Sequence, residues 1–244
     1  MQARNYAKYL RVLENTDRFL IAEKQPGVSF HAEGNREGLL QIIREMEETG
    51  ALPSGPRLYP VHRLDRITSG LIVFARERKN ANLLSNEFRH HRVEKYYIAL
   101  SDRPPRKKQG RVIGDMSRGR GKTWILNRSA KNPAVTFFFS KAIRGSRPGL
   151  RLFLLKPRTG RTHQIRSAMK SLSAPVLGDP LYGRYDLARE EDRAYLHAFC
   201  LRFRLGEESW SFVSPPSPGA EFESRAFQNA LREYSEPWKL SWPG

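Results

Sequence analysis

The apolar residues of this chain fall into short runs, and this feature limits the possible folds more than any other. The longest runs, "GLIVFA" and "LFLL", have the length of a β-strand. No run approaches the roughly 18 apolar residues that a membrane-spanning helix needs. The first residues also lack the apolar core of a signal peptide. The sequence therefore predicts strands and amphipathic helices without a membrane segment.

The predicted elements do not alternate regularly. Apolar residues at helical spacing predict helices over 36–49, 78–92 (including His90 and His91), 162–173 and 224–234. Strands are predicted over 18–24, 70–76, 94–101, 134–143, 150–157, 195–205 and 208–215. Residues 54–60 are predicted to form a loop. Several strand pairs without a βαβ repeat favour an α+β fold with a mixed, mostly antiparallel sheet. No long linker divides the chain, so we expect one catalytic domain over 1–244, which could have two lobes.

The charge balance indicates a polyanionic partner. There are 43 Lys and Arg against 25 Asp and Glu, a net charge of +18. Without a membrane segment, nucleic acid is the favoured partner. Residues 101–131 carry ten Lys and Arg against two Asp, a local charge of +8. Their Gly and Pro predict a mobile loop with a hairpin, and Trp124 beside these cations favours an RNA-backbone contact over a solvated insertion.

Several common sites are excluded by their missing residues. Cys200 is the only cysteine, so no internal disulfide can form, which is typical of a cytoplasmic protein; we expect it to pack as a small apolar side chain. A zinc site lacks clustered Cys and His ligands. The "GRGKT" segment lacks the first glycine of a phosphate-binding loop, because Met116 stands there. We therefore expect no metal and no cofactor, in a cytoplasmic monomer.

Four motifs in a fixed order carry the functional signal. They are "HRLDRITSG" at 62–70, Lys95, Tyr97 and Ala99 in "KYYIA", "TGRTHQIR" at 159–166, and "GDPLYG" at 178–183. Together they resemble the RluA family of pseudouridine synthases, whose motifs H-R-L-D-x-x-T-S-G, K-x-Y-x-A, T-G-R-x-H-Q-[IL]-R and G-D-x-x-Y-G occur in this order. Two departures exist: the family's N-K-P-x-G turn reads "EKQPG" here, and the chain is expected to lack the family's frequent N-terminal RNA-binding module.

The resemblance implies that uridine in RNA is isomerised to pseudouridine without a cofactor. Asp65 would be the essential carboxylate, either attacking the sugar or abstracting a proton from it. Arg166 would be its ionic partner, although it could instead bind phosphate. Tyr97 could stack on the uracil or accept a proton after the glycosidic bond has rearranged. Taken alone, Asp65 could also be a surface acid in a salt bridge with neighbouring arginines.

The resemblance also implies a set of RNA-binding residues. An enzyme that acts on a base extrudes it from its stack, and Arg63 could fill the gap that is left. The remaining candidates for substrate or RNA binding are His62, Arg66, Thr68, Arg161, His163 and Ile165. Asp179 is expected to fix the turn at "LGDPLYG". Ribosomal RNA is favoured over tRNA as the target. The alternative is a non-catalytic RNA-binding or ribosome-assembly protein that retains the fold; a nuclease or glycosylase would need a metal cluster or an acid pair.

Overall fold

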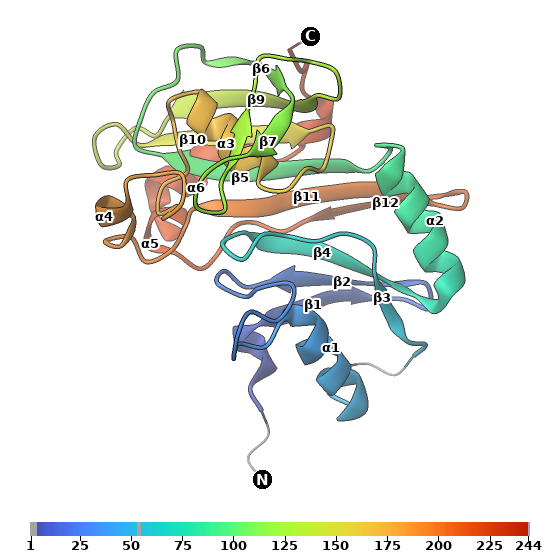
Figure 1. Cartoon of the computed structure of the whole chain (residues 1–244). Helices are drawn as coiled ribbons and strands as arrows, with labels where there is room; N and C mark the ends of the chain where they lie inside the picture. The colour runs from blue at the N-terminus through green and yellow to red at the C-terminus, as the bar shows by residue number, and fades with distance from the viewer. Residues whose placement is uncertain (1–3, 53–54, 244) are drawn as a thin grey trace. The chain divides into compact units, whose positions relative to one another are not determined.

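The computed structural model describes residues 4–52 and 55–243, which form two compact units (Figure 1). Unit 1 comprises Met1–Val93 and Leu201–Ser214, and unit 2 comprises Glu94–Cys200 and Pro215–Gly244. Strand β11 (Leu196–Leu205) begins in unit 2 and ends in unit 1. Within the described ranges, no helix is long and apolar enough to cross a membrane.

Unit 1 is built on a sheet in the order β1-β2-β4-β11, with β3 paired to β4 and β12 to β11; the pairs β1–β2, β2–β4 and β3–β4 are antiparallel. Leu10 pairs with Lys24 between β1 and β2, and Phe19 pairs with Ala75 between β2 and β4. Helix α2 packs on β3 and β4. The bounds are η1 Tyr6–Lys8, β1 Leu10–Asn15, β2 Phe19–Lys24, α1 Leu39–Glu48, β3 Leu58–Pro60, β4 Ser69–Arg76, α2 Glu77–Arg89 and β12 Glu208–Val213.

Alternating strand residues supply the core of unit 1. One apolar cluster takes Ile21 from β2, Val73 from β4 and Leu84 from α2, and aromatic residues of β11 and β12 complete it. Phe19 contacts the rings of Phe203 and Trp210 edge to face, with centroids 5.4 and 4.8 Å apart. Because these side chains come from strands that are distant in sequence, this core fixes β4, the strand into which the Asp65 turn leads.

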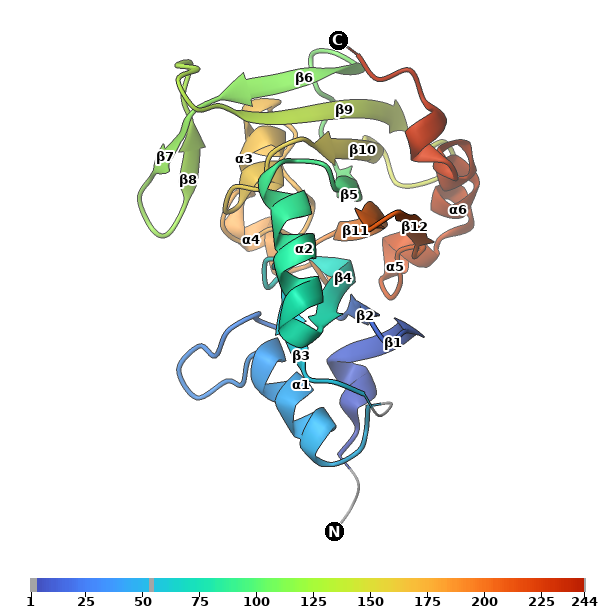
Figure 2. The ribbon, with the colours of Figure 1, turned by 90° about the vertical axis from the view of Figure 1, so that its right-hand side faces the viewer.

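Unit 2 contains the sheet order β11-β5-β10-β9-β6 and a separate two-stranded ribbon, β7-β8. Figure 2 shows α3 beside β9 and β10, and the ribbon projecting beyond the sheet. The bounds are β5 Glu94–Ser101, β6 Gln109–Gly114, β7 Met116–Arg118, β8 Trp124–Leu126, β9 Ala134–Ala142, β10 Arg151–Pro157, α3 Gln164–Ser171, α4 Tyr185–Ala188, α5 Ala220–Glu223, α6 Arg225–Leu231, η2 Arg232–Tyr234 and η3 Pro237–Lys239.

The sheet of unit 2 separates two apolar clusters. Ile98 and Leu154 belong to the cluster that includes α5, α6 and Cys200, whereas Ala99 and Leu155 belong to the cluster that includes α3. This alternation follows from the two-residue period of a strand. The expected packing of Cys200 as a small apolar side chain is confirmed by its place in the first cluster.

The predicted α+β fold with a mostly antiparallel sheet is confirmed, with local corrections. Strand β3 lies in the segment that was predicted to be a loop, of which Ser54 lies outside the described residues. Helix α2 ends at Arg89, so His90 and His91 are not helical; His91 has a φ of 57°. The basic segment contains β6, which pairs with β9, in addition to the predicted hairpin. The pairing of β6 with β9 thus places a strand in a segment whose Gly and Pro predicted a loop.

Candidate active site

Asp65 lies in a tight turn that leads into β4. The Thr68 N–H donates to the Asp65 carbonyl oxygen at 3.0 Å, which closes the turn. Thr68 is buried and Asp65 is half-buried, whereas Arg66 faces solvent. Gly70 follows with a φ of 104°, a conformation that side-chain-bearing residues rarely adopt, which explains the glycine of this motif.

A buried lysine joins this turn to the one after β2. The Lys24 ammonium donates to the carbonyl oxygens of Gln25 at 2.9 Å and Val28 at 2.8 Å, and to that of Arg66 at 3.3 Å. The Gly27 N–H donates to the same Arg66 oxygen at 2.9 Å. The "EKQPG" segment therefore keeps a tight turn despite its shifted proline, and it fixes the Arg66–Ile67 peptide group, inside the turn that begins at Asp65.

The histidine upstream of Asp65 is fixed by unit 1. The His62 ring accepts a hydrogen bond at Nε2 from the Val73 N–H at 3.0 Å, and it stacks on Phe88 with centroids 4.6 Å apart. The neutral ring consequently carries its proton on Nδ1 when this bond is present. Arg63 is exposed beside it. The motif thus places a fixed imidazole and a solvent-facing guanidinium on the same loop as Asp65.

In unit 2, Arg166 of α3 forms a two-pronged ion pair with Asp179. Arg166 Nε lies 2.7 Å from Asp179 Oδ2, and Nη2 lies 2.9 Å from Oδ1. Both side chains are buried, with exposures of 5% and 0%. This geometry fixes the plane and direction of the guanidinium. The sequence predicted the Arg166 position but assigned Asp179 only to its turn; the "GDPLYG" motif was the available signal for this second role.

The expected role of Asp179 in its turn is confirmed. Its Oδ1 accepts from the N–H groups of Leu181 at 2.9 Å and Tyr182 at 3.3 Å. Gly178 has a φ of 73°, and a Cβ there would lie 2.0 Å from the Arg193 carbonyl oxygen. Only glycine fits this close approach, which explains why Gly precedes the acid. One carboxylate therefore orders both the turn and Arg166.

Tyr97 lies on β5, half-buried beside the apolar cluster under α3. Lys95 lies two residues earlier on the same face of the strand and is buried. Burial lowers the pKa of the Lys95 ammonium to about 8. The Lys95 ammonium lies 3.9 Å from the position that a Cβ on Gly160 would take, so the K-x-Y and T-G-R motifs meet in unit 2.

The "TGRTHQIR" segment reaches the base of the ribbon. Arg161 donates through Nη2 to the side chain and the carbonyl oxygen of Asn132. His163 begins α3 with a φ of 56°, and its Nδ1 lies 3.2 Å from the Tyr182 hydroxyl. Ile165 is 8% exposed and packs in the apolar cluster with Met169. RNA binding by these three residues stays a prediction.

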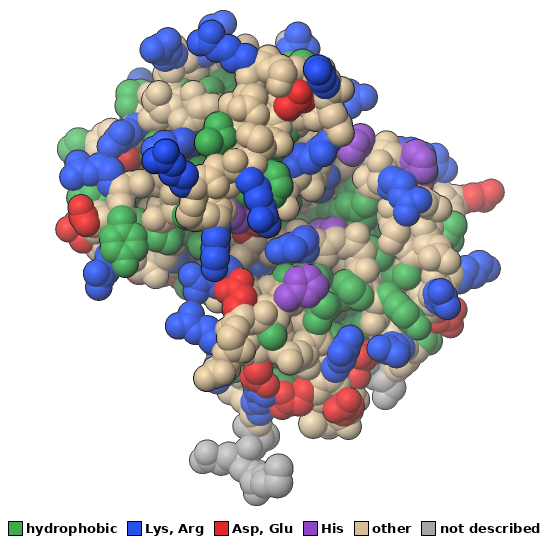
Figure 3. All heavy atoms as spheres, viewed as in Figure 1, with side chains coloured by type: hydrophobic (Ala, Val, Ile, Leu, Met, Phe, Trp, Pro, Cys, Tyr) green, Lys and Arg blue, Asp and Glu red, His purple; other side chains and the backbone are tan. Residues whose placement is uncertain are grey.

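Unpaired cations surround the ribbon. All ten Lys and Arg of residues 101–131 are exposed, and none forms an ion pair in the part of the chain that the structure describes. The Asp115 carboxylate is occupied by the N–H groups of Lys131 at 3.0 Å and Asn132 at 2.8 Å. Figure 3 shows Lys and Arg side chains spread over unit 2. Such a surface attracts a polyanion.

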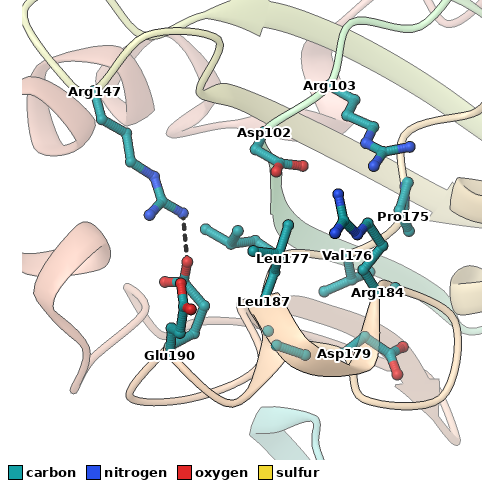
Figure 4. Close-up of a pocket in the computed structure, with 14 residues that line it drawn as sticks. Asp102, Arg103, Arg147, Pro175, Val176, Leu177, Asp179, Arg184, Leu187 and Glu190 are labelled. Carbon is teal, nitrogen blue, oxygen red and sulfur yellow. Dashed lines mark hydrogen bonds and ion pairs between the residues drawn. The ribbon is translucent and has the colours of Figure 1, made fainter.

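A hollow in unit 2 is lined by charged residues of both signs (Figure 4). Arg147 pairs with Glu191 at 2.8 Å on one side, and the guanidinium groups of Arg103 and Arg184 lie on the other, near Pro175. Asp102 and Glu190 also line it. Because both acids and arginines line this hollow, its charge is mixed, whereas the tip of the ribbon carries only cations.

Residues 18–171, more than half of the chain and the part that holds Asp65, Tyr97 and Arg166, match the family model described as RNA pseudouridylate synthase. The chain belongs to the RNA pseudouridylate synthase family. An uncharacterised RNA pseudouridine synthase of Haemophilus influenzae is 41% identical over 85% of this chain and 88% of its own length. The predicted RluA-type assignment and its isomerase class are thereby confirmed.

Other members of the family carry more specific names. A ribosomal large subunit pseudouridine synthase D of Borreliella burgdorferi is 32% identical over 63% of this chain, which spans 47% of that relative. A tRNA pseudouridine synthase C of Haemophilus ducreyi is 33% identical over 60% of this chain and 66% of its own length. The human RNA pseudouridylate synthase domain containing 1 has a TM-score of 0.70 and 26% identity, covering 88% of this chain and 86% of its own.

Proposed function

We propose that this chain isomerises specific uridines of structured RNA to pseudouridine, with Asp65 as the essential carboxylate. The observation that carries the proposal is the Asp65 turn: the acid of the H-R-L-D motif begins a turn whose Arg66 carbonyl oxygen accepts from the Lys24 ammonium at 3.3 Å and from the Gly27 N–H at 2.9 Å. A carboxylate that reacts with a sugar must hold its position without relying on the substrate, and this turn provides that.

The reaction needs no external reagent. The bond from N1 of uracil to C1′ breaks, the base turns, and a bond from C5 to C1′ forms. C5 loses a proton while N1 gains one, so atoms and electrons balance without an oxidant or a phosphate donor. Asp65 assists by attacking the sugar or by removing a proton from it, and both routes need the ionised carboxylate.

We assign Tyr97 and Arg166 of unit 2 to the same uridine. Arg166, held by Asp179, offers an oriented cation for Asp65 or a phosphate, and Tyr97 offers a ring for stacking on uracil. The two units would thus act as one catalytic domain. Arg63, exposed beside Asp65, would occupy the space of the extruded base. The unpaired cations of residues 101–131 would contact the RNA backbone.

The target RNA is proposed to be ribosomal in preference to tRNA. The names of the Borreliella burgdorferi and Haemophilus ducreyi relatives point to one class each, so the choice rests on experiment. Pseudouridine mapping of total RNA, in cells with and without the gene, should reveal one or a few sites that disappear in rRNA. An unchanged map would overturn the proposal, and sites lost only from tRNA would overturn the rRNA assignment.

The non-catalytic alternative predicts that Asp65→Asn leaves the biological effect of the gene intact. The catalytic proposal predicts the opposite in the same cells. Complementation with the wild-type gene should restore the lost sites, whereas Asp65→Asn should not. Exposed Asp17 of unit 1 supplies a matched control, since Asp17→Asn should complement fully. If Asp65→Asn restored both the sites and growth, Asp65 would not be the essential carboxylate.

A further inference from the structure

Tyr182 lies where three segments of unit 2 meet. It is 5% exposed, and its hydroxyl is surrounded by four polar atoms. The Trp124 N–H donates to it at 2.7 Å; His163 Nδ1 lies at 3.2 Å, Ser167 Oγ at 3.3 Å and the Trp124 carbonyl oxygen at 3.3 Å. The hydroxyl therefore connects β8 of the ribbon with the first turn of α3.

The ring and backbone of Tyr182 also hold Arg166. The Arg166 guanidinium carbon lies 4.9 Å from the centroid of the Tyr182 ring, which is within cation–π range. The Tyr182 N–H donates at 3.3 Å to Asp179 Oδ1, the same oxygen that accepts from Arg166 Nη2. A single residue thus contacts both the arginine and its carboxylate.

Within the described residues, β7 and β8 pair with no other strand, so the ribbon is held by contacts at its root, of which the Tyr182 hydroxyl is one. Its tip carries Arg118, Arg120 and Lys122, all exposed. At its root, Ser167 Oγ donates to the Trp124 carbonyl oxygen at 2.6 Å, beside the Tyr182 bond to the Trp124 N–H. Trp124 is therefore the point where the ribbon is fastened to the helix that carries Arg166.

We propose that Tyr182 is a positioning residue that couples RNA bound by the ribbon to Arg166. The inference rests on the proposed function and extends it, because it states that the ribbon and Arg166 are held in a fixed position relative to each other. A fixed root keeps the ribbon cations at a constant distance from Arg166, so less conformational freedom is lost when RNA binds. The hydroxyl holds the root of the ribbon through Trp124, and the ring contacts the Arg166 guanidinium.

The two parts of the side chain can be separated by substitution. Tyr182→Phe removes only the hydroxyl; we expect KM for the RNA to rise roughly fivefold, as the loss of one hydrogen bond implies, with kcat within twofold. The Trp124 amide should exchange with solvent faster. Tyr182→Leu also removes the ring, and kcat should then fall on the order of tenfold.

Tyr195→Phe is the matched control. Like Tyr182, Tyr195 is a buried residue whose hydroxyl accepts from a backbone N–H, that of Glu221, but this hydroxyl donates to the Asp192 carboxylate and contacts neither the ribbon nor α3 among the described residues. It should lower the Tm without changing KM or the exchange of Trp124. An equal rise of KM in Tyr195→Phe and Tyr182→Phe, or an unchanged KM in Tyr182→Phe, would overturn the coupling.

RNA affinity separates this inference from the proposed function. In an Asp65→Asn background, where no turnover is expected, Tyr182→Phe should still weaken RNA binding about fivefold. If the wild-type protein forms no pseudouridine, the proposed function fails, but this affinity ratio still tests the ribbon contact. A ratio near one would overturn the role of the hydroxyl even in an active enzyme.

Discussion

Unit 1 and unit 2 differ in charge and in how each holds its proposed catalytic residue. Unit 1 has 17 Lys and Arg against 13 Asp and Glu, a net charge of +4, whereas unit 2 has 26 against 12, a net charge of +14. Backbone carbonyl contacts from Lys24 fix the Asp65 turn, and a carboxylate fixes Arg166. The difference suggests a division of labour: unit 1 supplies the reacting acid, and unit 2 supplies affinity for the polyanion.

The largest effect on stability is expected in unit 2 from Asp179→Ala. The substitution removes the carboxylate that pairs with the buried Arg166 guanidinium and accepts from the turn N–H groups. The free energy of unfolding should fall by about 3–5 kcal/mol, as measured by urea denaturation. Asp186→Ala, in the exposed α4, is the control and should change it by less than about 0.5 kcal/mol. Equal effects would remove the assigned role of the pair.

Lys95 gives unit 2 a pH-dependent stability. Its folded pKa, about 8, lies below the ordinary value of 10.5. Between these values the unfolded chain binds a proton that the folded chain does not, so the free energy of unfolding should rise with pH across this window. Lys95→Met should lack this rise, which is worth about 3 kcal/mol. Urea unfolding of both proteins at pH 7 and 10 checks it; a difference independent of pH would contradict it.

Lys24→Met tests the lysine that holds the Asp65 turn in unit 1. The ammonium bonds three carbonyl oxygens, and its loss removes this donor from those of Gln25 and Val28 and leaves that of Arg66 with the Gly27 N–H. The free energy of unfolding should fall by about 2 kcal/mol, and kcat should fall more than RNA affinity, because the Asp65 turn loosens. Kinetics at several RNA concentrations separate the two. A change in affinity alone would mean that Lys24 serves binding and would break the division between the units.

The smallest effect is expected from neutralising the tip of the ribbon. Replacing Arg118, Arg120 and Lys122 by Ala should weaken RNA binding about tenfold and reduce the slope of log affinity against log salt by about 2. The triple substitution of exposed Arg44, Arg78 and Lys79 in unit 1 is the matched control. Its slope should stay close to that of the wild type. An equal change in both triples would indicate that net charge, and not the ribbon, determines affinity.

Periodicity in the sequence was sufficient for the long elements and failed where pairing decides the structure. Strand β4 and helix α1 were predicted because their apolar residues follow a strand or helix pattern. Strand β1 was missed, since half of its residues are polar and Leu10 is its one fully buried residue. Strand β6 was missed because the Gly and Pro of its segment predicted a loop, although its backbone pairs with β9. Such pairing depends on a partner that local sequence does not contain.

The sequence likewise predicted some parts of the candidate site and missed others. The motifs located Asp65, Tyr97 and Arg166 as candidates, because their residue types and order are distinctive. The side chains that hold them were not predicted. Tyr182 reaches Arg166 and Trp124 from separate segments, and the Arg166–Asp179 pair spans a helix and a turn. Contacts of this kind arise from tertiary packing.

The central claim is that unit 1 supplies the reacting carboxylate and unit 2 most of the affinity for RNA, and Asp65→Asn tests it most directly. The measurement is the rate of pseudouridine formation together with the Kd for the same RNA, which is identified by mapping. We predict that turnover falls at least about a thousandfold, while the Kd stays within about twofold of the wild type. A variant that retains turnover within about tenfold, or that loses RNA affinity in proportion to its activity, would contradict the account.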